Sequence, residues 1–224
     1  MPKHIPVDWV EQFMLGYKEI SDLYSIPLLG GDTTSSDGKL CINVAVLGKC
    51  PSKSAKKRSD AKVGDLVCVT GNLGDSAAGL KSILDSIERK DAVLHLIDRH
   101  YHPIPRVIEG ITLRNCNGVH AMMDISDGIG SDLRHILQAS HVGAEIDVNK
   151  IPNSQEMNCV CEQFGWNKYE LATCGGEDYE LLFTIDEDYC NQLNINYSVI
   201  GRIVEGDSLK WIGTEDDFVG FRHF

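Results

Sequence analysis

The alternation of hydrophobic and polar residues divides the chain into helical and extended segments. Apolar side chains recur at helical spacing over residues 8–25. We expect Asp8 to cap this helix and the apolar stripe to face a core. The stripe consists of Trp9, Val10, Phe13, Tyr17, Ile20 and Tyr24. A short buried-type strand at 26–29 and an alternating strand at 40–47 follow, with an Asp-Gly turn signal at 37–38 between them.

A polar, basic stretch at residues 51–60 is typical of a linker, and a second unit begins near residue 61. Its apolar runs predict strands at 65–70, 120–125, 144–148 and 179–185. Helices are expected after the glycine-rich turn at 71–80, over 85–115 with breaks at Pro103 and Pro105, and from 128 to about 140. We also expect turns at 172–178 and a hairpin around 205–207. Because helices and strands mix irregularly, the pattern predicts an α+β fold.

Charge and composition narrow the function classes. The 224 residues include 33 acidic and 21 basic ones, which gives a net charge of −12. A nucleic-acid-binding surface needs an excess of Lys and Arg, so we exclude that class. The apolar runs fall short of the roughly 20 residues of a membrane helix, and no signal peptide is recognised at the start. An acidic balance suits carboxylates gathered around divalent cations.

Eight cysteines are distributed along the chain without a Cys-x-x-Cys pair. Most lie in apolar runs, as Cys68 does. We favour reduced, buried thiols in a cytoplasmic protein over a disulfide framework.

Two motifs have the residue types of a magnesium–phosphate site. In Gly30-Gly31-Asp32, the glycines allow close approach of the backbone to phosphate, and Asp32 could hold a hard cation. On spacing alone, a strand-ending turn with a capping Asp remains the stronger interpretation. Asp124, Ser126 and Asp127 follow an apolar strand and precede a helix, where Mg²⁺ and phosphate could bind. A simple helix cap would explain Ser126 or Asp127 but not Asp124, whose unpaired charge at the end of an apolar strand would be costly.

Two further glycine-rich motifs are less specific. Glu177, in Gly175-Gly-Glu-Asp-Tyr-Glu180, could accept hydrogen bonds from a substrate ring, although the residues alone favour a solvated turn. The segment 71–79 lacks the G-x-G-x-x-G spacing of a dinucleotide loop, so we interpret it as tight strand–helix packing. No P-loop, H-E-x-x-H pattern or nucleophilic Ser/His/Asp set is recognised, and we assign no metal role to histidine.

In this order, the segments resemble those of the thiamine-monophosphate kinase family. The resemblance spans the chain. The matching phrases are Leu29-Gly-Gly-Asp-Thr-Thr34, Arg58-Ser-Asp-Ala61, Val69-Thr-Gly-Asn-Leu-Gly-Asp-Ser-Ala-Ala-Gly-Leu80, Asp124-Ile-Ser-Asp-Gly-Ile129, Gly175-Gly-Glu-Asp-Tyr-Glu-Leu181 and Gly220-Phe-Arg-His-Phe224. The resemblance implies an incomplete N-terminal α/β sandwich domain at 1–57, which binds ATP and magnesium and dimerises. A larger C-terminal mixed α/β domain of the aminoimidazole ribonucleotide synthetase-like type would occupy 58–224.

The resemblance also implies the activity and the roles of individual residues. Members of the family transfer the γ-phosphoryl group of ATP to thiamine monophosphate with the help of Mg²⁺, in the cytoplasm, as homodimers. The implied ATP contacts are Gly31, Asp32, Arg58 and Ser126. The implied magnesium ligands are Asp32, Asp124 and Asp127. The implied substrate contacts are Glu177 and Phe218. An anionic phosphate acceptor needs no general base, so positioning and charge neutralisation suffice.

The chain departs from the family at its start. Family members carry an upstream Gly-Asp-Asp motif and further magnesium ligands, so we expect this chain to be a fragment or to have a start assigned too far downstream. We therefore expect little or no kinase activity from it, and its dimerisation is in question. Two alternatives remain: a non-catalytic nucleotide-binding fragment, or a related superfamily synthetase that acts on another small molecule.

Overall fold

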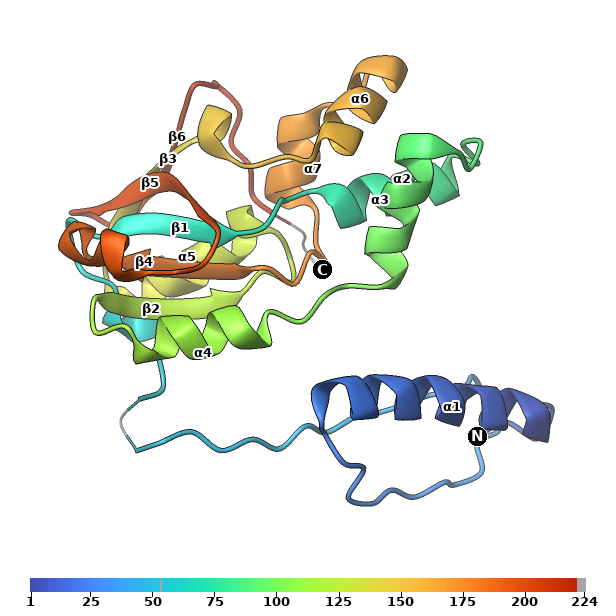
Figure 1. Ribbon diagram of the computed structural model, residues 1–224. Coiled ribbons are helices and arrows are strands. Elements are labelled where there is room, and N and C mark those ends of the chain that lie inside the picture. Colours follow the sequence, from blue (N-terminus) through green and yellow to red (C-terminus); the bar gives the residue numbers. More distant parts are fainter. Residues whose placement is uncertain (53, 221–224) are drawn as a thin grey trace. The chain divides into compact units, whose positions relative to one another are not determined.

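The computed structural model describes residues 1–52 and 54–220, so most of the C-terminal motif at 220–224 lies outside the described residues. The chain forms two compact units, Met1–Lys49 and Cys50–Phe224. Figure 1 shows the helices and strands of each unit.

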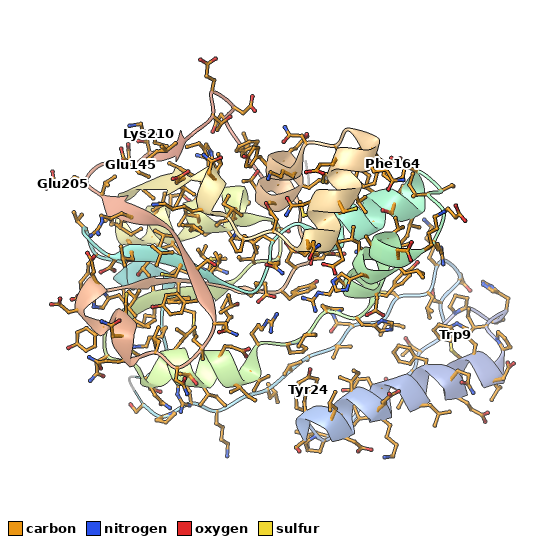
Figure 2. The ribbon with its side chains drawn as sticks, turned by 45° about the horizontal axis from the view of Figure 1, so that its top comes forward. Trp9, Tyr24, Glu145, Phe164, Glu205 and Lys210 are labelled. Carbon is orange, nitrogen blue, oxygen red and sulfur yellow. The ribbon has the colours of Figure 1, made fainter. Side chains whose placement is uncertain are left out.

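The first unit contains one helix, α1 (Val7–Tyr24), as the periodicity predicts. The residue at its N-terminus is Pro6, without a side-chain cap, so the prediction that Asp8 caps the helix is wrong; Asp8 lies in the first turn. No residue of α1 is buried, which contradicts the expected core-facing stripe. Trp9 instead stacks on Phe13 along the helix, with ring centroids 5.7 Å apart. Figure 2 shows Trp9 and Tyr24 near opposite ends of α1.

The two strands expected in this unit are not formed. Residues 26–29 and 40–47 have no strand assignment, and most of their apolar side chains are exposed. A strand exists only where a neighbouring strand pairs with its amide and carbonyl groups. Neither segment finds such a partner among the described residues, so alternation alone does not make it a strand.

The second unit is built on one six-stranded sheet, and the strands predicted at 65–70, 120–125, 144–148 and 179–185 are confirmed. The strands are β1 (Leu66–Thr70), β2 (Val119–Asp124), β3 (Gly143–Asp147), β4 (Leu181–Ile185), β5 (Tyr197–Val204) and β6 (Leu209–Ile212). Their order is β2-β4-β1-β5-β3-β6, with β3 and β6 parallel and the other pairs antiparallel. The predicted hairpin around 205–207 is wrong, because β3 lies between β5 and β6.

The sequence predicted the helices of the second unit up to residue 140, but not the two that follow in the described chain. The helices of this unit are α2 (Asp75–Leu84), α3 (Asp91–Tyr101), α4 (Val107–Asn115), α5 (Ile129–Ser140), α6 (Gln155–Phe164) and α7 (Lys168–Cys174), with short 3-10 turns at Arg58–Asp60, Val148–Lys150 and Glu187–Gln192. Pro103 and Pro105 fall between α3 and α4, as expected. The beginning of the turn predicted at 172–178 is instead the end of α7.

Alternate residues of the strands face two hydrophobic clusters. Val67 and Val69 of β1 join the larger cluster, to which α2, α3, α5, α6 and α7 contribute. Cys68, between them, joins the smaller cluster with Leu113 of α4 and Phe183 of β4. Both faces of the sheet are therefore covered. Figure 1 shows α2 and α3 side by side beyond one end of the sheet.

The glycine-rich segment after β1 is a packing element, as the sequence indicates. A Cβ atom on Gly79 would lie 2.1 Å from the carbonyl oxygen of Leu96, so α2 and α3 can approach this closely only because residue 79 has no side chain.

The cysteines are free thiols with mixed burial. Cys68 and Cys161 are buried as expected, whereas Cys41, Cys50 and Cys159 are exposed, which corrects the expectation of uniformly buried thiols. In the part of the chain that the structure describes, no helix is both long and apolar enough to span a membrane.

Candidate functional site

A pocket of about 490 Å³ opens in the second unit, where three sequence motifs meet. Ser76 and Leu80 come from α2, Asp127 from the turn after β2, and Glu177 and Tyr179 from the loop before β4. The rest of the wall comprises Ala77, Lys81, Leu84, Asp85, His100, Ser126, Cys174, Gly175 and Gly176. The pocket therefore combines an apolar wall with carboxylates, in the size range of small-molecule sites.

The turn after β2 is held by a buried carboxylate. Asp132, on the first turns of α5, accepts hydrogen bonds from the backbone amides of Ser126 (2.9 Å) and Asp127 (3.0 Å). Burial raises the pKa of Asp132, and the charges of Asp127 and Asp124 act in the same direction. The residue at the N-terminus of α5 is Gly128, without a side-chain cap. The simple-cap interpretation of Ser126 and Asp127 is therefore wrong, and both residues line the pocket instead.

The loop before β4 lies directly on this turn. The amide of Glu177 donates to the carbonyl of Ser126 and the amide of Tyr179 to that of Ile125, both at 2.9 Å. A Cβ atom on Gly176 would lie 2.4 Å from the carbonyl oxygen of Ser126, so glycine is required there. Glu177 and Tyr179 adopt positive φ angles, +66° and +51°. Such a conformation costs a non-glycine residue about 1–2 kcal/mol, which these backbone contacts offset.

The acidic residues around Tyr179 share one electrostatic neighbourhood. Burial raises the pKa of Tyr179, and the charges of Glu177, Asp124 and Asp127 raise it further. The acidic residues of two sequence motifs, about 50 residues apart in the chain, thus lie in one neighbourhood.

Asp178 faces away from this neighbourhood and fastens the loop to α2. Its carboxylate accepts hydrogen bonds from the amides of Gly74 (2.7 Å) and Ser76 (3.2 Å). Burial raises the pKa of Asp178 to about 7, against the lowering effect of these two bonds. Asp75, whose pKa burial also raises, accepts a hydrogen bond from Ser154 (2.6 Å). The amides of Gly74 and Ser76 are therefore occupied by a protein carboxylate and are not offered to a phosphate.

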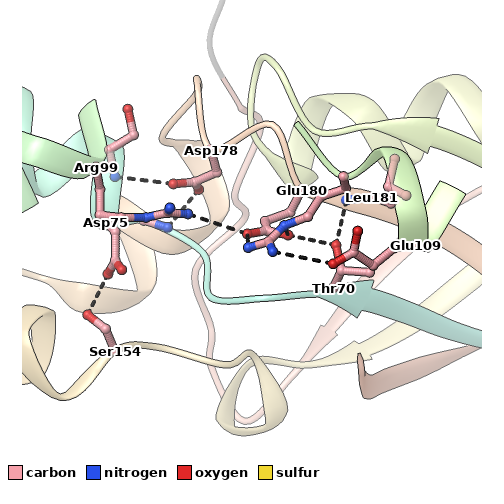
Figure 3. Close-up of polar contacts among 11 residues, drawn as sticks. Thr70, Asp75, Arg99, Glu109, Ser154, Asp178, Glu180 and Leu181 are labelled. Atoms are coloured by element: carbon pink, nitrogen blue, oxygen red, sulfur yellow. Dashed lines mark hydrogen bonds and ion pairs between the residues drawn. The ribbon is translucent and has the colours of Figure 1, made fainter. Parts of the chain in front are cut away.

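Glu180 anchors the other end of the loop in a buried network, shown in Figure 3. Its carboxylate is fully buried and accepts hydrogen bonds from Thr70 Oγ1 (2.7 Å) and Arg106 Nε (2.6 Å). The Nη2 atom of Arg99 lies 3.6 Å from Oε1 of Glu180. The hydrogen bond to Glu180 is the main cause that raises the pKa of Arg106. Because both ends of the loop are fixed, Glu177 and Tyr179 are held at the pocket wall.

The remaining residues singled out from the sequence lie in different surroundings. Asp124 is exposed, so the argument that its charge would be costly at the end of an apolar strand is wrong. Phe218 is buried and packs edge-on against Trp211, with ring centroids 5.3 Å apart, and is not among the residues that line the pocket. Arg58 is exposed in the 3-10 turn Arg58–Asp60.

Gly31 and Asp32 belong to the first unit, where both are exposed. The Asp32 carboxylate accepts a hydrogen bond from the amide of Thr33, at 2.8 Å. Residues 26–36 have no strand or turn assignment, so the strand-ending turn of the simpler interpretation is not formed in this part of the described chain.

The donor set for a metal is limited to carboxylates. Among residues 1–52 and 54–220, no three His, Cys, Asp or Glu side chains form a group that could hold a metal ion by themselves. Asp124 and Asp127 offer hard oxygen donors at the end of β2 and in the next turn. Mg²⁺ is commonly bound by one or two carboxylates plus substrate phosphates, so this donor set fits that ion.

Most pocket residues were not identified as site residues from the sequence, among them Ser76, Lys81, His100 and Tyr179. The position of Tyr179 between acids of one motif is a signal that could have identified it. His100 carries no local signal, because it reaches the pocket only through the packing of α3 on α2.

Comparison with protein families gives two matches. The family model described as AIR synthase related protein, C-terminal domain, matches residues 62–213, and the corresponding N-terminal domain model matches residues 1–50.

Comparison with individual proteins points to one kind of relative. The thiamine-monophosphate kinase of Buchnera aphidicola subsp. Schizaphis graminum is 39% identical over 239 residues, covering 100% of this chain and 72% of the relative. That of Aquifex aeolicus is 36% identical, with the same coverage.

Among solved structures, a related protein and a more distant protein share this fold. The structure described as "AaThiL complexed with AMPPCP and TMP" has a TM-score of 0.86 at 33% identity and covers 100% of this chain and 71% of its own. The hydrogenase maturation protein HypE of E. coli has a TM-score of 0.73 at 19% identity over 96% of this chain and 68% of its own, which shows a shared fold.

Proposed function

Since the chain belongs to the thiamine-monophosphate kinase family of AIR synthase related proteins, we propose that it transfers the γ-phosphoryl group of ATP to thiamine monophosphate. The products are thiamine diphosphate and ADP. One observation carries this proposal: motifs from α2, the turn after β2 and the loop before β4 line a single pocket. The related structure with AMPPCP and TMP bound supports ATP and thiamine monophosphate as the two substrates.

The chemistry needs little from the protein beyond placement and charge neutralisation. A phosphate oxygen of thiamine monophosphate attacks the γ-phosphorus, a new P–O bond forms, and the bond to the β-phosphate oxygen breaks with its electrons going to ADP. The attacking oxygen is anionic at neutral pH, so no base has to remove a proton. In the pocket, backbone hydrogen bonds at Asp127 and Glu177 fix the positions of the two acidic residues.

For the nucleotide we propose contacts from Gly31, Asp32, Arg58 and Ser126. Ser126 lines the pocket, and the guanidinium of an exposed Arg58 suits phosphate oxygens. Gly31 and Asp32 belong to the other unit, so the proposal for these two residues rests on the resemblance of their motif to that of the family.

For Mg²⁺ we propose Asp124, Asp127 and Asp32 as ligands. The first two offer carboxylate oxygens beside a pocket that would receive phosphates. An ion held by them would neutralise phosphate charge.

For thiamine monophosphate we propose Glu177 and Phe218 as contacts. Glu177 and Asp127 give the pocket negative charge, and Leu80, Leu84 and Tyr179 give it apolar and aromatic walls. That combination suits a planar, cationic heterocycle. The burial of Phe218 against Trp211 gives no support to its part of this assignment.

The test is a product assay with ATP, Mg²⁺ and thiamine monophosphate, in which thiamine diphosphate is separated and quantified. Formation of thiamine diphosphate, abolished in Asp127→Asn, supports the kinase. Mg²⁺-dependent ATP binding without product would instead support a nucleotide-binding fragment. Calorimetry adds the decisive control: failure to bind thiamine monophosphate would favour a synthetase with another substrate.

Activity of this chain, homodimer formation and a cytoplasmic location stay predictions. The same assay measures the turnover of this chain, and sedimentation equilibrium measures its oligomeric state. A reaction that consumes ATP and a phosphate ester is consistent with the cytoplasm.

A further inference from the structure

His100, near the end of α3, lies between Ser76 and Glu177 in the pocket wall. Its Nδ1 atom is 3.0 Å from Ser76 Oγ and 3.5 Å from Glu177 Oε2. The exposed fraction of the side chain is 14% for His100 and 56% for Glu177. The ring therefore links a buried hydroxyl of the scaffold to an exposed carboxylate at the pocket.

The packing of two helices creates this arrangement. Gly79 of α2 lets the backbone of α3 approach at Leu96. Ser76 lies three residues before Gly79 and His100 four residues after Leu96, so the next turns of the two helices bring these side chains together. Ser76 is in turn held by its amide, which donates to Asp178. The packing of α2 on α3 and the contact with Ser76 therefore determine where the His100 ring lies.

The same contacts rule out a nucleophilic relay. In a Ser-His-acid triad, the serine and the acid bind opposite nitrogens of the ring. Here Ser76 and Glu177 both contact Nδ1, and Ser76 is almost completely buried. The geometry is that of a ring that orients a carboxylate.

The other charged groups of the pocket do not replace this contact. Lys81 pairs with Asp85 at 2.9 Å and lies over the Trp166 ring. Asp127 is an acid like Glu177 and cannot attract it. We propose that His100 is a positioning residue, which fixes the Glu177 carboxylate toward the cationic organic part of thiamine monophosphate. The proposal deepens, and rests on, the function proposed above.

Binding of thiamine monophosphate, measured by calorimetry, tests the proposal. His100→Gln removes the nitrogen at the Nδ1 position, and we expect Kd to rise about tenfold, the scale of one hydrogen bond to a charged group. His100→Asn places a polar atom where Nδ1 lies and should restore most of the affinity. The Kd of an ATP analogue should change less than about twofold, because the inferred contact concerns the substrate side alone.

A matched control and a double-mutant cycle separate positioning from a general structural role. His102→Ala alters an exposed histidine that pairs with Asp98 at 2.8 Å, and should leave both affinities unchanged. In a Glu177→Gln background, His100→Gln should cause little further loss. Equal loss in both backgrounds, or no loss in the wild-type background, overturns the proposal.

A ligand-free measurement keeps the test independent of the proposed function. The ¹⁵N signals of the His100 ring should shift in Glu177→Gln and stay unchanged in Glu162→Gln, a control on α6. Unshifted His100 signals in Glu177→Gln overturn the positioning role. If the wild-type chain fails to bind thiamine monophosphate while the signals shift, the substrate assignment fails and the contact between His100 and Glu177 stands.

Discussion

The two units differ in what their apolar residues do. In the first unit, α1 has no buried residue, and Leu15 and Leu23 are 58% and 68% exposed. In the second, the residues of the two hydrophobic clusters cover both faces of a six-stranded sheet. Both regions show clear hydrophobic periodicity in the sequence. Periodicity therefore indicates which element forms, whereas burial requires a second surface against which that element can pack.

The largest expected difference between the units is in protease susceptibility. Residues 26–50 of the chain have no helix or strand, whereas the strands of the second unit are hydrogen-bonded on a packed sheet. We expect thermolysin to cut within 26–50 at least about a hundredfold faster than within β1 or β4, since local opening is far easier there. Mass spectrometry of timed digests measures the order of cleavage. First cuts inside the sheet would show that the strands of the second unit open more readily than residues 26–50.

Matched leucine substitutions test the same contrast in free energy of unfolding. Leu133 of α5 is completely buried, and Leu133→Ala should lower the free energy of unfolding by about 2–5 kcal/mol. Leu15→Ala on α1 should change it by less than about 0.5 kcal/mol, because that side chain is already exposed. Urea denaturation of both variants measures the two values. Similar losses at both positions would show that α1 packs as a core helix does.

A smaller effect concerns pH and the buried carboxyl of Asp178. Its folded-state pKa, about 7, lies above its ordinary value of 3.8. The folded state therefore keeps a proton that the unfolded state loses, so this group's contribution to stability falls as pH rises from about 4 to 7, by at most about 1.4 kcal/mol per pH unit. Asp178→Asn should make the decline of stability over this window shallower.

The matched control for Asp178 is an exposed aspartate. Asp207→Asn, in the turn between β5 and β6, should leave the slope of stability against pH unchanged. Denaturation at pH 5, 6 and 7 gives one slope of stability against pH for each protein: wild type, Asp178→Asn and Asp207→Asn. An identical slope in wild type and Asp178→Asn would show that Asp178 is ionised throughout this window.

The smallest effect is expected at the surface of the second unit, where Glu145 and Lys210 face each other across β3 and β6 (Figure 2). Their charged atoms are 3.0 Å apart, and both side chains are well exposed. Glu145→Gln should lower the free energy of unfolding by less than about 1 kcal/mol, and salt should reduce the difference. Denaturation at low and high ionic strength checks this, and a loss of several kcal/mol would contradict it.

Much of the second unit could be predicted from the sequence because its signals are local. Alternation identified β1 to β4, and the two prolines identified the break between α3 and α4. Asp127 and Glu177 were identified because the motifs that contain them resemble those of the family, since residue types alone left a helix cap and a solvated turn open. Their presence in one pocket follows from backbone bonds between loops about 50 residues apart, which no local pattern contains.

By itself, the sequence determined β1 to β4 and the helices from α2 to α5 in the second unit, the tight packing of the glycine-rich segment after β1, and which motifs carry carboxylates. The tertiary structure alone decided that β6 pairs with β3, that α1 stays exposed, that Asp178 is buried enough to raise its pKa, and that His100 meets Glu177. The physical reason is that backbone conformation depends on neighbouring residues. Strand partners, burial and electrostatic surroundings depend on which distant surfaces come into contact.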